Sequence, residues 1–281
     1  MKRSLVLGGG GSYGIGWQSG ILVGLAEAGF DAREVDFILG TSAGSQVGAV
    51  VASSLAWEEI WARQVDPLLE NHYLPSPVEA ATLLQLYAQI RNQAKSPQEW
   101  ILGLGALSAA MTVSEAQRLR EVAQRLQLST WPSRLGVVGV DIQSGGRVLW
   151  TRESCVDLIR AVAASSALPA AYPAVAIGER LYCDGGVYSM ENADLAASYQ
   201  KVLILSVGLP IPTPYTLDDQ VALLRRSGAE VEVIQPDQNV LSVLRHAGGN
   251  AVDPLLRAPV AKAARLQALS IAEKLSWFWN D

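Results

Sequence analysis

The chain has 281 residues, of which 49% are hydrophobic, and this length and composition predict one large α/β domain with a full core. Its formal net charge is -5 and it has no cluster of Lys and Arg, which argues against a nucleic-acid partner and against strong electrostatic docking to anionic lipid. No apolar run is long enough to span a bilayer, so we expect a cytoplasmic protein that contacts a membrane surface only transiently.

The first predicted elements are a strand over residues 4–7, a glycine-rich loop over residues 8–14 and a helix over residues 16–28. The apolar run before the glycines is too short for a secretion signal, so we interpret it as a core strand. A glycine loop between a strand and a helix exposes backbone N–H groups at the amino end of the helix. This arrangement is typical of sites that bind a phosphate or another anion.

Two interpretations of the glycine loop differ in function. Gly9, Gly11 and Gly14 satisfy the G-x-G-x-x-G fingerprint of dinucleotide-binding proteins. That fingerprint requires an acidic residue at the end of the following strand, and none is present there. The loop is also typical of an oxyanion hole, in which the N–H groups of Gly9, Gly10 and Gly11 stabilise a tetrahedral intermediate. The sequence that follows favours the oxyanion hole.

The second predicted strand leads into Gly40-Thr41-Ser42-Ala43-Gly44 and then into a helix of small residues. This pentapeptide fits the G-x-S-x-G nucleophile elbow, in which a serine occupies a strained turn between a strand and a helix. The two glycines let the strand and the helix pass closely, and the amino end of the helix directs its N–H groups at the serine. The alternative is an ordinary strand-to-helix turn.

A helical insertion is predicted over residues 56–130, where apolar residues recur at helical spacing. Within it, residues 97–111 form an apolar segment that contains glycines. We interpret this segment as part of the core. The alternative is a mobile lid or a lipid-contacting surface over the site.

The sheet resumes with four predicted strands, of which the first two, residues 135–141 and 147–151, are joined by a hairpin turn. The last of the four ends at Asp184-Gly185-Gly186. An aspartate at the end of a strand, followed by two glycines, can approach another loop closely and act in catalysis. The alternative is a tight turn with a capping aspartate.

Late strands over residues 201–208 and 231–235 flank a helix over residues 217–228. Strands that alternate with helices predict a mostly parallel sheet. The chain ends in a long helix from about residue 253 and an aromatic tail, residues 277–279. We expect this tail to fold back on the core, and the alternative is an interfacial membrane anchor.

A serine nucleophile needs a base, and the chain has two histidines, His72 and His246. The order Ser42, Asp184, His246 is that of an α/β-hydrolase triad. Such an enzyme normally has several strands before its elbow, whereas here the elbow ends only the second strand. A Ser42–Asp184 dyad fits the chain better, because a buried aspartate within hydrogen-bond reach can act as the general base. We therefore interpret His246 as a loop or surface residue.

The sequence resembles the patatin-like phospholipases, in particular their bacterial members. Residues 9–14 are similar to the family's glycine-rich oxyanion motif, residues 40–44 to its nucleophile elbow and residues 184–186 to its catalytic Asp-Gly-Gly/Ala motif. Further similarity lies in residues 140–145, 164–169 and 192–195. These motifs follow one another in family order over nearly the whole chain.

This resemblance implies a three-layer α/β/α sandwich with a mostly parallel central sheet. It also implies hydrolysis of lipid acyl esters by Ser42 and Asp184 through an acyl-enzyme. One position departs from the family pattern: residue 13 is Tyr, where the glycine motif usually carries Arg or Lys. This departure leaves open whether the substrate is a phospholipid or a neutral acyl ester.

No cofactor or metal is expected, because no Asp, Glu, His or Cys cluster has ligand spacing. The two cysteines, Cys155 and Cys183, are typical of small residues in a reducing compartment. The expected partner is a lipid or acyl-ester substrate, and nothing in the sequence indicates an oligomeric state. The alternative function is a catalytically silent protein that binds a lipid, or that binds a nucleotide through the glycine loop.

Overall fold

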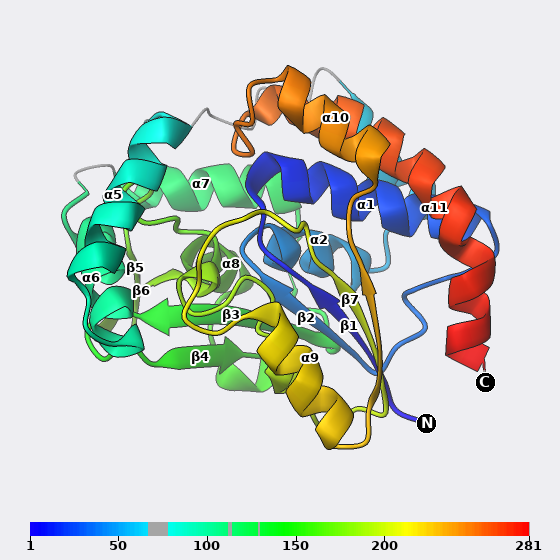
Figure 1. Ribbon diagram of the computed structural model, residues 1–281, viewed down its shortest axis with the longest axis horizontal. Coiled ribbons are helices and arrows are strands. Elements are labelled where there is room, and N and C mark those ends of the chain that lie inside the picture. The colour runs from blue at the N-terminus through cyan, green and yellow to red at the C-terminus, as the bar shows by residue number, and fades with distance from the viewer. Residues whose placement is uncertain (67–77, 112–113, 129, 281) are drawn as a thin grey trace.

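The computed structural model describes residues 1–66, 78–111, 114–128 and 130–280, and it shows an eight-stranded sheet between helices (Figure 1). The strands are β1 (Arg3–Leu7), β2 (Phe37–Thr41), β3 (Leu135–Asp141), β4 (Arg147–Trp150), β5 (Val175–Ile177), β6 (Arg180–Asp184), β7 (Lys201–Leu205) and β8 (Glu230–Ile234). Their order in the sheet is β5-β6-β3-β2-β1-β7-β8, and β4 pairs with β3. The predicted hairpin of residues 135–151 is therefore confirmed.

The strands β3, β2, β1, β7 and β8 are parallel, whereas β4, β5 and β6 pair antiparallel. The carboxyl ends of parallel strands meet at one edge of a sheet. Here Thr41, the last residue of β2, pairs with Val138 of β3, and the next residue of β3, Gly139, pairs with Asp184 of β6. This register brings the ends of β2 and β6 together.

Helices cover both faces of the sheet because side chains of the central strands alternate between two cores. Leu5 and Leu7 point into the larger core, and Val6 between them points into the second core with Leu224. The larger core lies under α1 (Gly11–Glu27), α2 (Ala43–Val51), α8 (Leu158–Ser165), α10 (Gln238–His246) and α11 (Arg257–Asn280), and the second under α9 (Leu217–Arg226). The expected sandwich with a mostly parallel sheet is confirmed.

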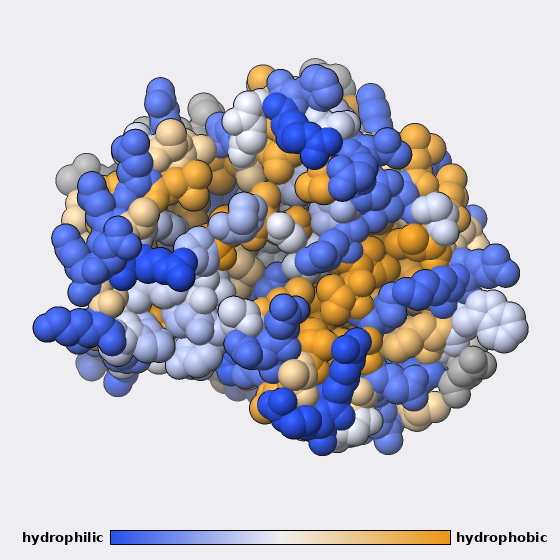
Figure 2. Space-filling view, in the orientation of Figure 1, coloured by the Kyte–Doolittle hydropathy of each residue, from blue (hydrophilic) through white to orange (hydrophobic). Residues whose placement is uncertain are grey.

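The surface beside the edge strand β8 is partly apolar. Figure 2 shows hydrophobic residues gathered between α9 and α11, with hydrophilic residues around them. In the described part of the chain, no helix combines the length and apolar character that a membrane crossing requires.

Helices α1 and α11 pack closely because three glycines of α1 lie on one face. Gly16, Gly20 and Gly24 recur every four residues, so they form a continuous stripe along the helix. A Cβ atom on Gly20 would collide with the carbonyl oxygen of Ala261 and lie 2.8 Å from Ala264 Cβ. The glycine stripe therefore determines how closely α11 approaches α1.

The helical insertion contains α3 (Trp57–Val65), α5 (Ala80–Gln93), α6 (Pro97–Ala109) and α7 (Glu115–Leu126). Ser96 caps α6 by accepting a hydrogen bond from Glu99 N, and Pro97 occupies the first turn. α6 buries Trp100, Ile101 and Leu104 in a cluster that also contains Val140 and Cys183 of the sheet. The predicted apolar segment 97–111 is thus part of a core, and its opening as a lid stays a prediction.

The C-terminal helix returns to the sheet, as expected for the aromatic tail. Trp279 is buried against Phe30, with ring centroids 5.7 Å apart. Arg3 Nη2 donates to Trp279 O at 2.8 Å, and Lys201 Nζ donates to Phe278 O at 2.7 Å. These two cations lie at the negative end of the helix dipole of α11, where they stabilise it. Trp277, by contrast, is exposed.

Candidate active site

Ser42 lies in a strained turn between β2 and α2. Its backbone has φ 53° and ψ -115°, a conformation that residues other than glycine rarely adopt. A Cβ atom on Gly44 would collide with the Leu7 carbonyl, so only glycine lets α2 begin so close to β1. The turn therefore holds the Ser42 side chain at the edge of the sheet where the parallel strands end.

Asp184, the last residue of β6, is the hydrogen-bond partner of Ser42. Ser42 Oγ donates to Asp184 Oδ2 at 2.6 Å, and Gly186 N donates to Asp184 Oδ1 at 2.7 Å. The aspartate is only 2% exposed. Its carboxylate is thus oriented by two donors and aimed at the serine hydroxyl.

The pKa of the Asp184 carboxyl lies closer to neutral pH than that of an exposed aspartate. Burial raises the pKa of its carboxyl to about 6, because it disfavours the charged form. The hydrogen bonds from Ser42 and Gly186 and the charge of Arg118 lower the pKa and partly oppose this effect. An aspartate with this pKa is still mostly ionised at pH 7, and it is a stronger base than an exposed aspartate.

The glycine-rich loop lies beside Ser42. A Cβ atom on Gly9 would be 3.5 Å from Ser42 Cβ. The helix α1 begins at Gly11, earlier than the predicted residue 16, so the last glycines of the loop form its first turn. In the described part of the chain, the N–H groups of Gly10 and Gly11 donate no hydrogen bond to a protein acceptor.

Gly9 differs from its two neighbours. Its N–H donates to Met190 O at 2.8 Å, so it is not available to an oxyanion in this conformation. Of the three N–H groups expected to form the oxyanion hole, that of Gly9 is therefore already engaged, and a role for Gly10 and Gly11 stays a prediction. Gly9 instead fastens the loop to the segment that follows Asp184.

A cavity of about 130 Å³ opens over Ser42 and Asp184. Much of its wall is apolar and comes from the helical insertion and the loops around the strand ends. The wall includes Tyr87, Trp100, Leu104, Leu168, Tyr172, Val187, Met190, Leu209 and Ile211. Besides Asp184, the charged residues that line it in the described structure are Arg118 and Arg125 of α7.

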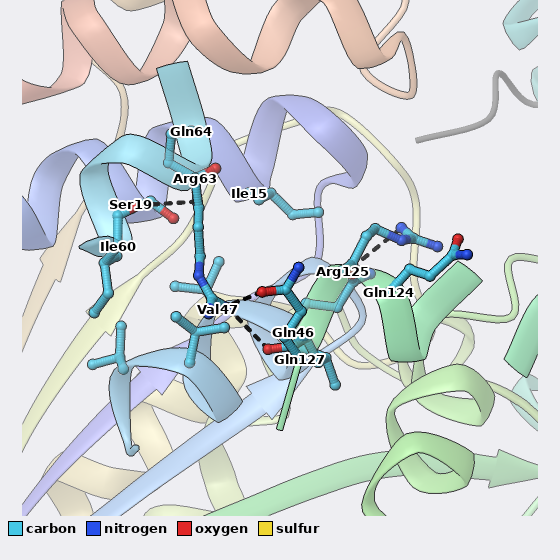
Figure 3. A pocket seen from close by; sticks show the side chains of 13 residues that line it. Ile15, Ser19, Gln46, Val47, Ile60, Arg63, Gln64, Gln124, Arg125 and Gln127 are labelled. Atoms are coloured by element: carbon cyan, nitrogen blue, oxygen red, sulfur yellow. Dashed lines mark hydrogen bonds between the residues drawn. The ribbon is translucent and has the colours of Figure 1, made fainter. Parts of the chain in front are cut away.

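A second, smaller cavity of about 40 Å³ adjoins the first and lies among α1, α2, α3 and α7 (Figure 3). Ile15, Gln46 and Arg125 line both cavities. Arg125 Nη1 donates to Gln46 Oε1 at 3.3 Å. This contact therefore lies at the border between the apolar site and a cavity rich in Arg and Gln side chains.

A comparison with protein families identifies the chain. The profile of the patatin-like phospholipases matches residues 5–197. The chain belongs to the patatin-like phospholipase family. It is therefore a member of a family of lipid hydrolases. A comparison with curated protein sequences gave no match.

Solved structures to which the chain is similar include VipD and ExoU. VipD from Legionella pneumophila has a TM-score of 0.47 and 10% identity, over 97% of this chain and 67% of that one. The type III effector ExoU has a TM-score of 0.43 and 18% identity, over 97% of this chain and 53% of that one. ExoU in complex with SpcU, from Pseudomonas aeruginosa, has a TM-score of 0.43 and 16% identity, over 100% and 53%. The chain spans about half the length of the ExoU chains.

The residue that departs from the family's glycine motif does not face the cavity. Tyr13 is fully buried in the larger core and is not part of the cavity wall, and burial raises the pKa of its hydroxyl. Its N–H donates to Ala251 O at 3.0 Å. The cations at this site come instead from Arg118 and Arg125, which sequence reasoning missed because nothing in the pattern of α7 shows where it docks.

The histidines lie elsewhere. His246 is exposed at the end of α10, and its Nδ1 is 2.7 Å from Ser242 O. It lines a separate hollow and not the cavity over Ser42. His72 lies outside the described residues. In the described part of the chain, no group of three His, Cys, Asp or Glu side chains has an arrangement that could hold a metal.

Asn192 links the two segments that carry Ser42 and Asp184. Its Nδ2 donates to Thr41 Oγ1 at 3.1 Å and to Gly185 O at 3.2 Å. These are the residues directly before the serine and directly after the aspartate. The motif at residues 192–195 was noted in the sequence, but its role as a cross-link becomes visible only in the fold.

Proposed function

We propose that this protein is a serine acyl hydrolase that cleaves lipid acyl esters through Ser42 and Asp184. The observation that carries the proposal is the 2.6 Å hydrogen bond from Ser42 Oγ to a buried carboxylate whose pKa is raised to about 6. A base poised near neutral pH beside a strained serine is the arrangement that nucleophilic catalysis requires. Membership of the family supports the same chemistry.

The proposed reaction has two steps. As Ser42 Oγ bonds to the ester carbonyl carbon, its proton passes to Asp184, and the N–H groups of Gly10, Gly11 and Ala43 stabilise the oxyanion. The carbon–alkoxy bond then breaks, and the alcohol leaves with the proton from Asp184. In the second step, water gives a proton to Asp184 and attacks the acyl-enzyme, so that the fatty acid leaves and Ser42 regains its hydrogen.

The proposed substrate is an ester with an apolar acyl group. The cavity wall contains Trp100 and Leu104 of α6 and Leu209 and Ile211 of the loop after β7, so an acyl chain can lie against apolar side chains. Such a substrate resides in a membrane or micelle, so the enzyme would contact a lipid surface transiently. No cofactor takes part in the proposed reaction.

The test is intact-mass labelling with a fluorophosphonate, which reacts with activated serines. We expect one adduct on the wild type, none on Ser42→Ala and wild-type labelling of His246→Ala. Hydrolysis of a p-nitrophenyl acyl ester should follow the same pattern. Loss of labelling in folded His246→Ala would instead support a triad. Wild-type labelling and hydrolysis in Ser42→Ala would refute the proposed site. Lipid binding without an adduct or turnover on the wild type would indicate a silent lipid-binding protein.

A further inference from the structure

Two residues of the segment 165–167, which begins at the last residue of α8, bind the backbones of the two members of the proposed dyad. Ser42 N donates to Ser165 Oγ at 3.0 Å. Asp184 N donates to Ala167 O at 3.1 Å. The segment of residues 165–167 therefore holds the backbones of both the serine and the aspartate. All three of its residues are buried.

Arg118 of α7 holds the middle of this segment. Its Nη2 donates to Ser166 O at 3.0 Å and to Ser166 Oγ at 2.9 Å. The Arg118 guanidinium lies 3.9 Å from the ring centroid of Tyr172, and Nη1 is 3.6 Å from Glu121 Oε2. With 3% exposure, the side chain has little freedom to move. A planar guanidinium that stacks on a tyrosine ring and donates two hydrogen bonds is a rigid support for the segment.

The same guanidinium is the positive charge that acts on Asp184. Among the described residues, the titratable groups that interact electrostatically with Asp184 are Arg118 of α7, Tyr87 of α5 and Cys183 of β6. Burial raises the pKa of the Tyr87 hydroxyl and of the Cys183 thiol, so both stay neutral near pH 7. Burial lowers the pKa of Arg118 to about 10, which still leaves it charged there.

We propose that Arg118 is a positioning residue for the Ser42–Asp184 pair, which it serves by fixing the segment of residues 165–167 and by placing a cation near the carboxylate. The inference rests on the proposed hydrolase function. It gives α7, and so the helical insertion, a role in catalysis beyond covering the cavity. A change in the position of α7 relative to α8 would alter the geometry of the dyad without any contact to the substrate.

Two substitutions at residue 118 separate geometry from charge. Arg118→Gln removes the charge, so the pKa of Asp184 should rise. The acid limb of kcat/KM, which is its decline at low pH, should therefore move up by about one pH unit. The kcat should also fall roughly 10- to 100-fold, because the pair loses its alignment. Arg118→Lys keeps the charge but not the planar guanidinium that lies over the Tyr172 ring while it bonds to Ser166. We expect it to lower kcat similarly while the acid limb stays near the wild-type position.

Further variants control for stability and for helix charge. Ser165→Ala removes only the acceptor of Ser42 N, so kcat should fall with no shift of the acid limb. Arg120→Gln removes a charge from an exposed position of the same helix and should change neither quantity. Thermal unfolding shows whether each variant is folded. If Arg118→Gln does not fold, Arg118→Lys and Ser165→Ala together still test the proposal.

The readouts are the pH dependence of ester hydrolysis and of the rate of fluorophosphonate labelling. Wild-type kcat and an unmoved acid limb in folded Arg118→Lys and Ser165→Ala would overturn the positioning role. This outcome differs from failure of the hydrolase proposal, in which Ser42→Ala retains turnover or the wild type has none. The labelling rate reports the serine itself, so it does not depend on the choice of substrate.

Discussion

Ser42 and Asp184 lie 142 positions apart in the chain, and their side chains meet at a hydrogen bond of 2.6 Å. The contact exists because β2 and β6 both adjoin β3, which places the ends of both strands at one edge of the sheet. Ser165 Oγ and Asn192 Nδ2 then bind the segments that carry the two residues. The geometry of the pair is thus set by the sheet and by hydrogen bonds from two further loops.

The first prediction concerns the pH dependence of hydrolysis. Because Asp184 must be ionised to accept the proton from Ser42, kcat/KM should rise about tenfold per pH unit below pH 6 and level off above its pKa of about 6. The measurement is kcat/KM for a neutral acyl ester between pH 4.5 and 8. His246→Ala should keep the same acid limb. A kcat/KM that stays nearly level from pH 8 down to pH 4.5, as the lower pKa of an exposed aspartate would give, would contradict the prediction.

The second prediction concerns stability. The pKa of Asp184 is about 6 in the folded protein and about 3.9 in the unfolded chain, so between these values the folded state binds more protons. The stability contribution of this group is therefore full below pH 4 and is lost as the pH rises through 6. Asp184→Asn does not titrate. Its free energy of unfolding relative to the wild type should thus increase by about 2–3 kcal/mol from pH 4 to pH 7.

Urea unfolding of the wild type and Asp184→Asn at pH 4 and at pH 7 measures this difference. Asp218→Asn, at a position in the first turn of α9 away from the site, is the matched control and should not show an increase of this size. An equal difference between Asp184→Asn and the wild type at both pH values would show that the carboxyl does not have a raised pKa. Asp184→Asn should also lose ester hydrolysis at both pH values.

Local motifs carried enough information to predict the strand ends of the site. The G-x-S-x-G pattern around Ser42 predicts a strained turn after a strand, and the two glycines after Asp184 predict a second strand end. The alternation of strands and helices likewise predicted the mostly parallel sheet. These features depend on residues that are close together in the sequence.

Contacts between distant segments could not be predicted in the same way. Gly9 looked like an oxyanion donor, but its N–H is taken by Met190 O, which comes from a loop after β6. The role of Arg118 depends on how α7 docks against α8, and amphipathic spacing does not determine that docking. Tyr13 departs from the family's glycine motif, but its side chain lies in the larger core, which the sequence around it does not indicate.

The third prediction concerns the glycine stripe of α1. Gly20→Ala should destabilise the protein by roughly 2 kcal/mol, because the added methyl group meets the Ala261 carbonyl and Ala264 Cβ of α11. This cost exceeds the gain of less than about 1 kcal/mol that alanine gives within a helix. Thermal unfolding measures the change, expected as a lower Tm. Gly146→Ala, where the nearest atom to a new Cβ is Ser144 Oγ at 3.1 Å, is the control. Equal Tm values for both variants would contradict the prediction.

The fourth prediction tests the link through Asn192. This residue has φ 54°, which glycine adopts freely, so Asn192→Gly keeps the backbone but removes the amide that joins Thr41 to Gly185. The serine and the aspartate should then align less well, and kcat should fall roughly 10- to 100-fold. The acid limb should stay near pH 6, because the lost group carries no charge. Arg118→Gln shifts that limb, so comparing the two variants separates loss of alignment from loss of charge. Wild-type kcat in folded Asn192→Gly would mean that the sheet alone holds the pair in place.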